Sequence, residues 1–88
     1  LLQRQPDYAT ARVKLADALR LLDRHEEALA QWQQLLQQRP GNPILLERYA
    51  NTLRDLGRET EARDAYLEAL RGFRAKSDRN RVQRLLSK

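Results

Sequence analysis

The sequence predicts an all-α fold, a right-handed α-solenoid built from antiparallel helical hairpins. One reason is an internal repeat with a period of 34 residues, which is typical of solenoid proteins. Another is the spacing of the apolar residues, which recur at steps of three and four within each period. The breaks between these apolar stripes are also short, and a short connection forces neighbouring helices to run antiparallel.

The repeat emerges when residues 1–40 are compared with residues 35–74. Twelve of the 40 pairs are identical, against roughly four expected by chance for a chain so rich in leucine, arginine and alanine. The match includes residues 1–6, which follow the pattern of residues 35–40. We therefore expect residues 1–6 to be the tail of a preceding repeat, and the chain to be a fragment of a longer array.

The first unit is expected to span residues 7–40. Its first helix carries a stripe of leucines at helical spacing. A short break begins at Asp23, because aspartate tolerates the left-handed conformation that ends a helix. The second helix then carries the next stripe. In order along the chain, the two stripes comprise Leu15, Leu19, Leu22, Ala28, Leu29, Trp32, Leu35 and Leu36.

The second unit is expected to span residues 41–74. Pro40 ends the preceding helix, and Pro43 suits the first turn of the next one, where a missing N–H costs nothing. Gly57 supplies the left-handed residue between the two helices of this unit. The apolar stripes on either side of it comprise Leu45, Leu46, Tyr49, Leu53, Leu56, Ala62, Ala65, Tyr66, Ala69 and Leu70.

Residues 75–88 share no identity with residues 41–54, so the repeat ends near residue 74. The last segment is expected to form one more helix, beginning at Ser77 or Asp78 as its cap. Its apolar side consists of Val82, Leu85 and Leu86. Because solenoids need a terminal element that covers the last apolar face, we expect residues 75–88 to be a C-terminal capping helix.

Small and large side chains are expected to alternate where the two helices of a hairpin meet. Alanines suit the points of closest approach, and the aromatic residues fill the wider gaps beside them. The aromatic residues could instead form a ligand box, but their spacing is that of internal packing positions. Tyr8 lies between units and is compatible with either role. The alanine pairs are Ala16 with Ala28 and Ala50 with Ala62, and the packing aromatics are Trp32, Tyr49 and Tyr66.

These residues resemble the tetratricopeptide repeat (TPR), whose pattern is W-x2-L-G-x2-Y, then A-x3-F, then P. The resemblance covers residues 1–74 and departs from the pattern at Arg12, a position usually apolar, and at Arg74, which replaces the closing proline. It implies a non-catalytic scaffold for protein–protein interaction. The matching positions are Leu15, Ala16, Leu19, Ala28, Trp32 and Pro40 in unit one, and Leu46, Tyr49, Ala50, Leu53, Ala62 and Tyr66 in unit two.

The resemblance also implies a concave groove, lined by the first helix of each unit, that holds a protein or peptide segment. Its arginines favour an acidic peptide or C-terminus, because guanidinium groups bind carboxylates bidentately. The carboxylate clamp of chaperone-type relatives is not supported, since its Lys and Asn positions are Val13 and Asp17 here. The expected groove residues are Thr10, Val13, Lys14, Asp17, Arg20, Ile44, Glu47, Arg48, Asn51 and Arg54.

The composition argues against an enzyme and against a cofactor or metal. The 88 residues include no Cys and one His, His25, which is expected at an exposed hairpin corner. One His cannot make a zinc site, and Glu59 and Glu61 are two apart on a helix and do not face each other. No phosphate-binding loop or nucleophile motif is present. No run approaches the about 18 apolar residues that a membrane span needs.

Positive charge is concentrated at the end of the chain. The net charge is +5, and residues 71–88 carry seven basic groups and one acidic group. This end could bind nucleic acid or an anionic membrane, but no aromatic residue is interleaved in it for base stacking, so a solvated capping helix is favoured. Another alternative is a structural or oligomerisation segment that self-associates through the N-terminal edge at Leu1 and Leu2.

Overall fold

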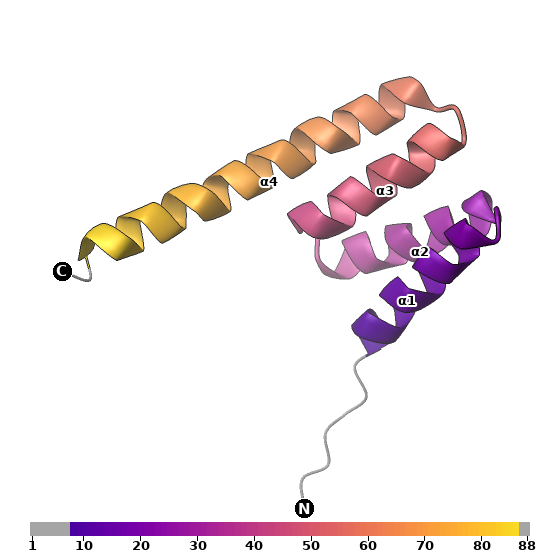
Figure 1. The fold of residues 1–88 in the computed structure, drawn as a ribbon, viewed down its shortest axis with the longest axis horizontal. Helices are drawn as coiled ribbons and strands as arrows, with labels where there is room; N and C mark the ends of the chain where they lie inside the picture. The colour runs from indigo at the N-terminus through magenta and orange to yellow at the C-terminus, as the bar shows by residue number, and fades with distance from the viewer. Residues whose placement is uncertain (1–7, 87–88) are drawn as a thin grey trace, which may run out of the picture.

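The computed structural model describes residues 8–86, with the side chain of Val82 left out. This part of the chain forms four helices and no strand: α1 (Tyr8–Leu21), α2 (His25–Gln38), α3 (Pro43–Asp55) and α4 (Glu59–Leu86) (Figure 1). The all-α solenoid of helical hairpins is therefore confirmed. The predicted tail of a preceding repeat, residues 1–6, lies outside the described residues.

The two hairpin turns have the same backbone structure. Asp23 and Gly57 both adopt the left-handed conformation, with φ of 62° and 80°. The amide of Arg24 donates to the carbonyl of Leu19 at 2.8 Å, and the amide of Arg58 donates to the carbonyl of Leu53 at 2.9 Å. The prediction that the chain reverses at Asp23 and Gly57 is confirmed, because both helices end on a residue that tolerates positive φ.

The connection between α2 and α3 uses a different device. Asn42 caps α3: its side-chain oxygen accepts from the amides of Ile44 and Leu45 at 3.0 and 3.1 Å. Pro43 occupies the first turn as predicted, where its missing N–H leaves no bond unmade. These local signals fix the start of α3, which is the central helix of the packing.

The core lies on both sides of α3. One cluster of buried residues joins α1, α2 and α3, and a second joins α2, α3 and α4. Trp32 is fully buried, and its indole N–H donates to the hydroxyl of Thr52 at 3.0 Å. The alanines predicted at close approaches have almost no exposed surface, which is consistent with short distances between helices. They are Ala16, Ala28, Ala50 and Ala62.

Helix α4 corrects the prediction for the C-terminal segment. It runs unbroken through Ser77 and Asp78 to Leu86, so the separate helix expected to begin at Ser77 or Asp78 does not exist. The physical reason is that no Pro or Gly follows Gly72 in this helix, and the Ala, Arg and Lys residues that follow are good helix formers.

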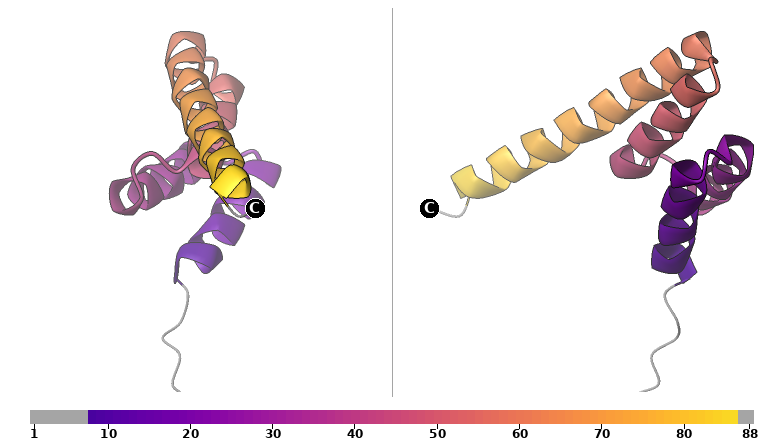
Figure 2. Two further views of the ribbon diagram at one scale, coloured as in Figure 1. Left: turned by 90° about the vertical axis from the view of Figure 1, so that its left-hand side faces the viewer. Right: turned by 45° about the vertical axis from the view of Figure 1, so that its right-hand side comes forward.

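The second half of α4 does not cover the repeats. Gly72 packs so closely on the start of α3 that an added Cβ would lie 2.9 Å from the Cβ of Pro43. Beyond this point residues 74–81 and 83–86 are exposed. Figures 1 and 2 show this half projecting away from the other helices. Leu85 and Leu86, expected to face the last repeat, therefore lie in solvent.

Candidate interaction surface

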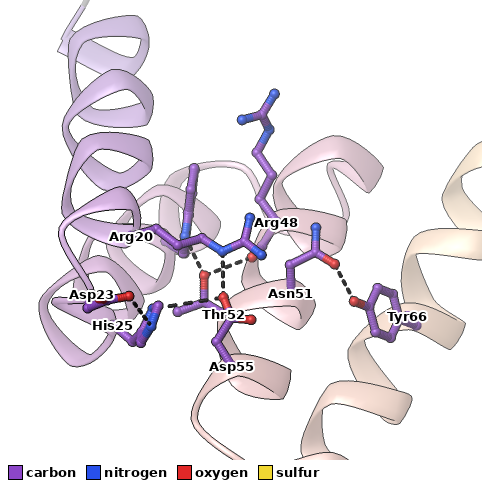
Figure 3. A network of polar contacts seen from close by, with 9 residues as sticks. Arg20, Asp23, His25, Arg48, Asn51, Thr52, Asp55 and Tyr66 are labelled. Carbon is purple, nitrogen blue, oxygen red and sulfur yellow. Dashed lines mark hydrogen bonds and ion pairs between the residues drawn. The ribbon is translucent and has the colours of Figure 1, made fainter.

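Two ion pairs join α1 to α3, the first helices of the two hairpins. The Arg48 Nη1 lies 2.6 Å from Asp17 Oδ2. The Arg20 Nε lies 2.5 Å from Asp55 Oδ2 (Figure 3). Each pair includes one residue from either helix, so the pairs fix the register of α1 against α3. Because all four residues are polar and lie at the surface, they also set the charge of this surface.

The Arg20–Asp55 pair changes the acidity of both groups. The hydrogen bond from Arg20 holds the pKa of the Asp55 carboxyl below its ordinary value, although desolvation acts in the opposite direction. The same hydrogen bond raises the pKa of the Arg20 guanidinium. The pair is therefore charged throughout the neutral range.

His25 lies closer to this network than the sequence predicted. Its side chain is 22% exposed, not fully exposed at a corner, and its imidazole lies near Asp55 of α3 (Figure 3). Its Nδ1 is buried without a hydrogen bond, 3.8 Å from Asp55 Oδ2, and its Nε2 lies 3.6 Å from Asp23 Oδ1. Among the described residues, no group of three or more His, Cys, Asp or Glu side chains could hold a metal ion.

The ten predicted groove residues divide into two sets. Five are exposed: Thr10, Lys14, Ile44, Glu47 and Arg54. The other five are half-buried: Val13, Asp17, Arg20, Arg48 and Asn51.

The half-buried set is engaged within the protein. Val13 packs against the core cluster around Trp32, and the hydroxyl of Tyr66 donates to Asn51. Arg20 and Arg48 each bind a carboxylate of the chain itself. The assignment of these ten residues to a binding groove stays a prediction. Within the ten, the five exposed side chains are more accessible to a ligand than the five half-buried ones.

Sequence reasoning missed two residues of this network. Thr52 is fully buried, accepts from the Trp32 indole, and its hydroxyl donates to the carbonyl of Arg48 at 3.0 Å. Asp55 pairs with Arg20 although the position equivalent to Asp55 in the first unit is Leu21. Because neither contact repeats in the other unit, comparison of the two units could not reveal them. Arg12, which departs from the family pattern, donates to Gln31 of α2 at 2.7 Å.

A hollow of about 350 Å³ lies between α3 and α4. Of the residues that line it, the sequence pattern assigned Ala62, Tyr66 and Leu70 to packing and Arg54 to the groove, and it did not reveal the hollow as a surface. Leu67 and Leu70 are 47% and 54% exposed there. Arg54 contributes from α3, and the residues from α4 are Glu59, Ala62, Arg63, Tyr66, Leu67 and Leu70.

The remaining predicted features lie at the two ends of the molecule. At α1, Tyr8 and Leu15 are exposed beside a hollow of about 200 Å³, while Leu1 and Leu2 fall outside the described residues. At the other end, the basic side chains of α4 are exposed, and Lys88 falls outside the described residues. The exposed basic residues are Arg71, Arg74, Lys76, Arg79, Arg81 and Arg84.

The aromatic residues assigned to packing lie in the core. Trp32 is buried, and Tyr49 and Tyr66 are half-buried against the same clusters. In the part of the chain that the structure describes, no helix combines the length and the apolar character needed to cross a bilayer.

Comparison with known families gave one match. A sequence model described as tetratricopeptide repeat matches residues 1–43 and residues 22–79. The two matches overlap and together cover α1, α2, α3 and most of α4. No curated protein and no solved structure matches the chain.

Proposed function

The chain belongs to the tetratricopeptide repeat family, whose members typically act as scaffolds for protein–protein interaction, and from this premise we propose that it binds a peptide or protein segment along α1 and α3. The observation that carries the proposal is the pair of ion pairs, Arg48–Asp17 and Arg20–Asp55, that joins the two helices. They hold α1 and α3 in register before a ligand arrives. A surface ordered in advance loses less conformational entropy on binding.

The exposed side chains beside these pairs indicate the chemistry of the ligand. Lys14 offers a cation, and Ile44 offers an apolar contact that is 47% exposed. Arg48 is 41% exposed at its side chain, so its guanidinium has donors left for a second carboxylate. We propose a segment with an acidic residue that meets Lys14 and Arg48, and an apolar residue that meets Ile44.

The proposed ligand contacts leave out Arg20, although its charge made it a predicted groove residue. Arg20 is committed to Asp55, and reversing its charge would place two carboxylates together and destabilise the protein. Variants of Arg20 would therefore confuse loss of binding with loss of folding. Lys14 is the better probe, because it is exposed on α1 and lies outside both ion pairs.

The test is selection of binding peptides from a displayed random library, with the full chain as target. Selected peptides are expected to be rich in Asp and Glu with one large apolar residue. Lys14→Glu should weaken their binding about tenfold, the effect of one charge-assisted contact. The matched control is Lys76→Glu, which makes the same charge change on the projecting half of α4 and should leave binding within about twofold.

Two results would contradict the proposal that a peptide binds along α1 and α3. One is equal binding of the selected peptides to Lys14→Glu and to the parent chain. The other is a loss with Lys76→Glu as large as the loss with Lys14→Glu, since this would assign recognition to overall charge or to the end of α4.

A second candidate function is binding of a polyanion by the projecting half of α4. The observation that favours it is the exposure of five basic residues, Arg74, Lys76, Arg79, Arg81 and Arg84, along a part of the helix that does not cover the repeats. Binding of a single-stranded oligonucleotide should then weaken steeply with salt, because neutralised phosphates release counterions. Fluorescence anisotropy checks this, and the absence of binding at low salt eliminates the candidate.

A further inference from the structure

The α1/α2 hairpin binds α3 through a defined set of side chains. Arg20 and His25 approach Asp55, with the arginine at 2.5 Å and the histidine at 3.8 Å. Trp32 donates to Thr52. Leu29 packs with Ala50 and Leu53, and Leu36 packs against the cluster that contains Leu45. One face of the hairpin is thus covered by an amphipathic helix with an apolar stripe and one carboxylate near its end.

The hollow on α3/α4 is the equivalent face of the second unit. A shift of 34 residues converts Arg20, His25, Ala28, Leu29, Trp32, Gln33 and Leu36 into Arg54, Glu59, Ala62, Arg63, Tyr66, Leu67 and Leu70. These are the seven residues that line the hollow of about 350 Å³. The second unit therefore presents, in the open, the surface that the first unit uses to hold a helix.

Two features of this face preserve the recognition chemistry. Arg54 is identical to Arg20, the residue that binds the carboxylate of α3. Tyr66 and Leu70 replace an aromatic and an aliphatic residue with side chains of the same type. An occupant of the same design, an amphipathic helix with a terminal carboxylate, therefore fits here as well.

Three other features distinguish the face from its counterpart. Arg63 replaces Leu29, Glu59 replaces His25 and Leu67 replaces Gln33, so the face gains one cation, one carboxylate and one exposed aliphatic side chain. Because Arg63 stands where the first face has a leucine, the matching occupant carries an acidic residue opposite it.

We propose that the α3/α4 face binds an amphipathic helix of a partner protein in the position that α3 takes on α1/α2. A carboxylate of the partner pairs with Arg54, a second acidic residue faces Arg63, and its apolar side covers Leu67 and Leu70. Apart from Arg54, which was also predicted for the groove, this face shares no residue with the α1 and α3 groove, and it requires a helical partner.

Helix α3 covers the first face, so a peptide with its sequence is used as the probe for the second face. A peptide with the sequence of residues 42–56, acetylated and amidated, carries the α3 side chains, including Asp55. Its titration into the isotopically labelled full chain is followed by the NMR signals of the backbone amides. We expect shifts at Arg54 and along residues 59–70, with the α1 amides unchanged.

Charge reversal tests the predicted pair. Arg54→Glu in the chain should weaken the peptide about tenfold, and Asp55→Lys in the peptide should restore binding to that variant while it binds the parent chain poorly. Replacing both Leu67 and Leu70 by Glu should abolish the shifts. The matched control replaces Leu85 and Leu86 by Glu in the same helix, where both side chains are exposed, and should change nothing.

Three outcomes would overturn the proposal. The first is an absence of shifts with millimolar peptide, and the second is shifts confined to α1 and α2, which would mean that the peptide displaces α3. The third is concentration-dependent shifts at Leu67 and Leu70 without peptide, which would make a second copy of the chain the occupant. Lys14→Glu should leave peptide binding unchanged, so failure here and failure of the groove proposal are separable.

Discussion

The α1/α2 face and the α3/α4 face are built from equivalent residues but have different surroundings. In the first, Trp32 is fully buried because α3 covers it, whereas its counterpart Tyr66 is half-buried beside an open hollow. Leu36 is half-buried, but its counterpart Leu70 is 54% exposed. Position within the repeat decides which side chains are apolar, and the neighbouring helix decides how much of each is removed from water.

The difference has an energetic consequence. A solenoid is stabilised by its units and by the interfaces between them, so residues at the covered face contribute to both terms. No further helix covers the open face, so residues there gain no contribution from an interface on that side. Equivalent substitutions on the two faces should therefore lower the free energy of unfolding by unequal amounts. The difference measures how much the interface between the two units contributes to stability.

The largest effect is expected for Trp32→Ala. It removes a fully buried indole and its hydrogen bond to Thr52, at a cost of about 3–5 kcal/mol. For a domain of this size the loss approaches the entire stability. Tyr66→Ala, at the equivalent position, should cost about 1–2 kcal/mol because its ring is already half in water. Urea unfolding followed by circular dichroism measures both.

A third variant separates the ring from the hydroxyl. Tyr66→Phe loses the bond to Asn51 and retains the packing, and should cost about 1 kcal/mol or less. Equal losses for Trp32→Ala and Tyr66→Ala would mean that α3 contributes nothing at the first face beyond what the hairpin supplies.

A smaller effect is expected where a side chain is added. Ala62 fronts the open hollow but is itself 2% exposed, within the cluster that includes Leu53 and Ala65. Ala62→Leu should overpack this contact and cost about 1–3 kcal/mol. The control is Ala30→Leu on the exposed side of α2, which should be close to neutral in a melting experiment. A melting temperature for Ala62→Leu equal to that of the parent chain would contradict the close approach of α3 and α4.

The repeat explains why the hairpins could be predicted. Asp23 and Gly57 occupy equivalent positions, and each lies between two apolar stripes, so two independent signals identified each turn. Asn42 and Pro43 similarly carry local capping chemistry that acts within a few residues. Features that depend on local conformation or on the 34-residue repeat can be predicted from a single sequence.

The features that could not be predicted depend on contacts between units or on the absence of a contact. Ser77 and Asp78 resemble helix caps, but nothing around them stops the helix, and good helix formers continue it. Asp55 has no acidic counterpart in the first unit, so its pairing with Arg20 depends on the distance between α1 and α3. Leu67 and Leu70 are exposed because no other described helix packs on them. The pattern of apolar residues does not show whether such a helix is present.

The ion pair at the covered face should have a modest effect that depends on pH. Because the pKa of Asp55 is lowered by folding, its contribution is complete above the unfolded value of about 3.9 and is lost as pH falls through the folded value. The pair is partly exposed, so Asp55→Asn should cost about 1 kcal/mol or less at pH 7. The difference from the parent chain should shrink to near zero at about pH 2.

Urea unfolding of both proteins across this pH range checks the prediction. Asp64→Asn provides the matched control on the exposed side of α4, and its difference from the parent chain should stay small at every pH. A constant difference between Asp55→Asn and the parent chain from pH 7 to pH 2 would show that packing, and not the charge of Asp55, is responsible.

The smallest effect on stability is expected at the projecting half of α4, which has neither a covered nor an open face of the repeat type. Asn80→Pro should break the helix there, because proline removes a backbone donor and clashes with the preceding turn. Residues 74–81 and 83–86 are exposed, so the broken segment takes no buried contact with it. Circular dichroism should therefore report less helix while the urea midpoint changes little. Ala65→Pro, in the buried half of the same helix, should unfold the domain. A midpoint lowered by Asn80→Pro as much as by Tyr66→Ala would mean that the end of α4 packs on the repeats after all.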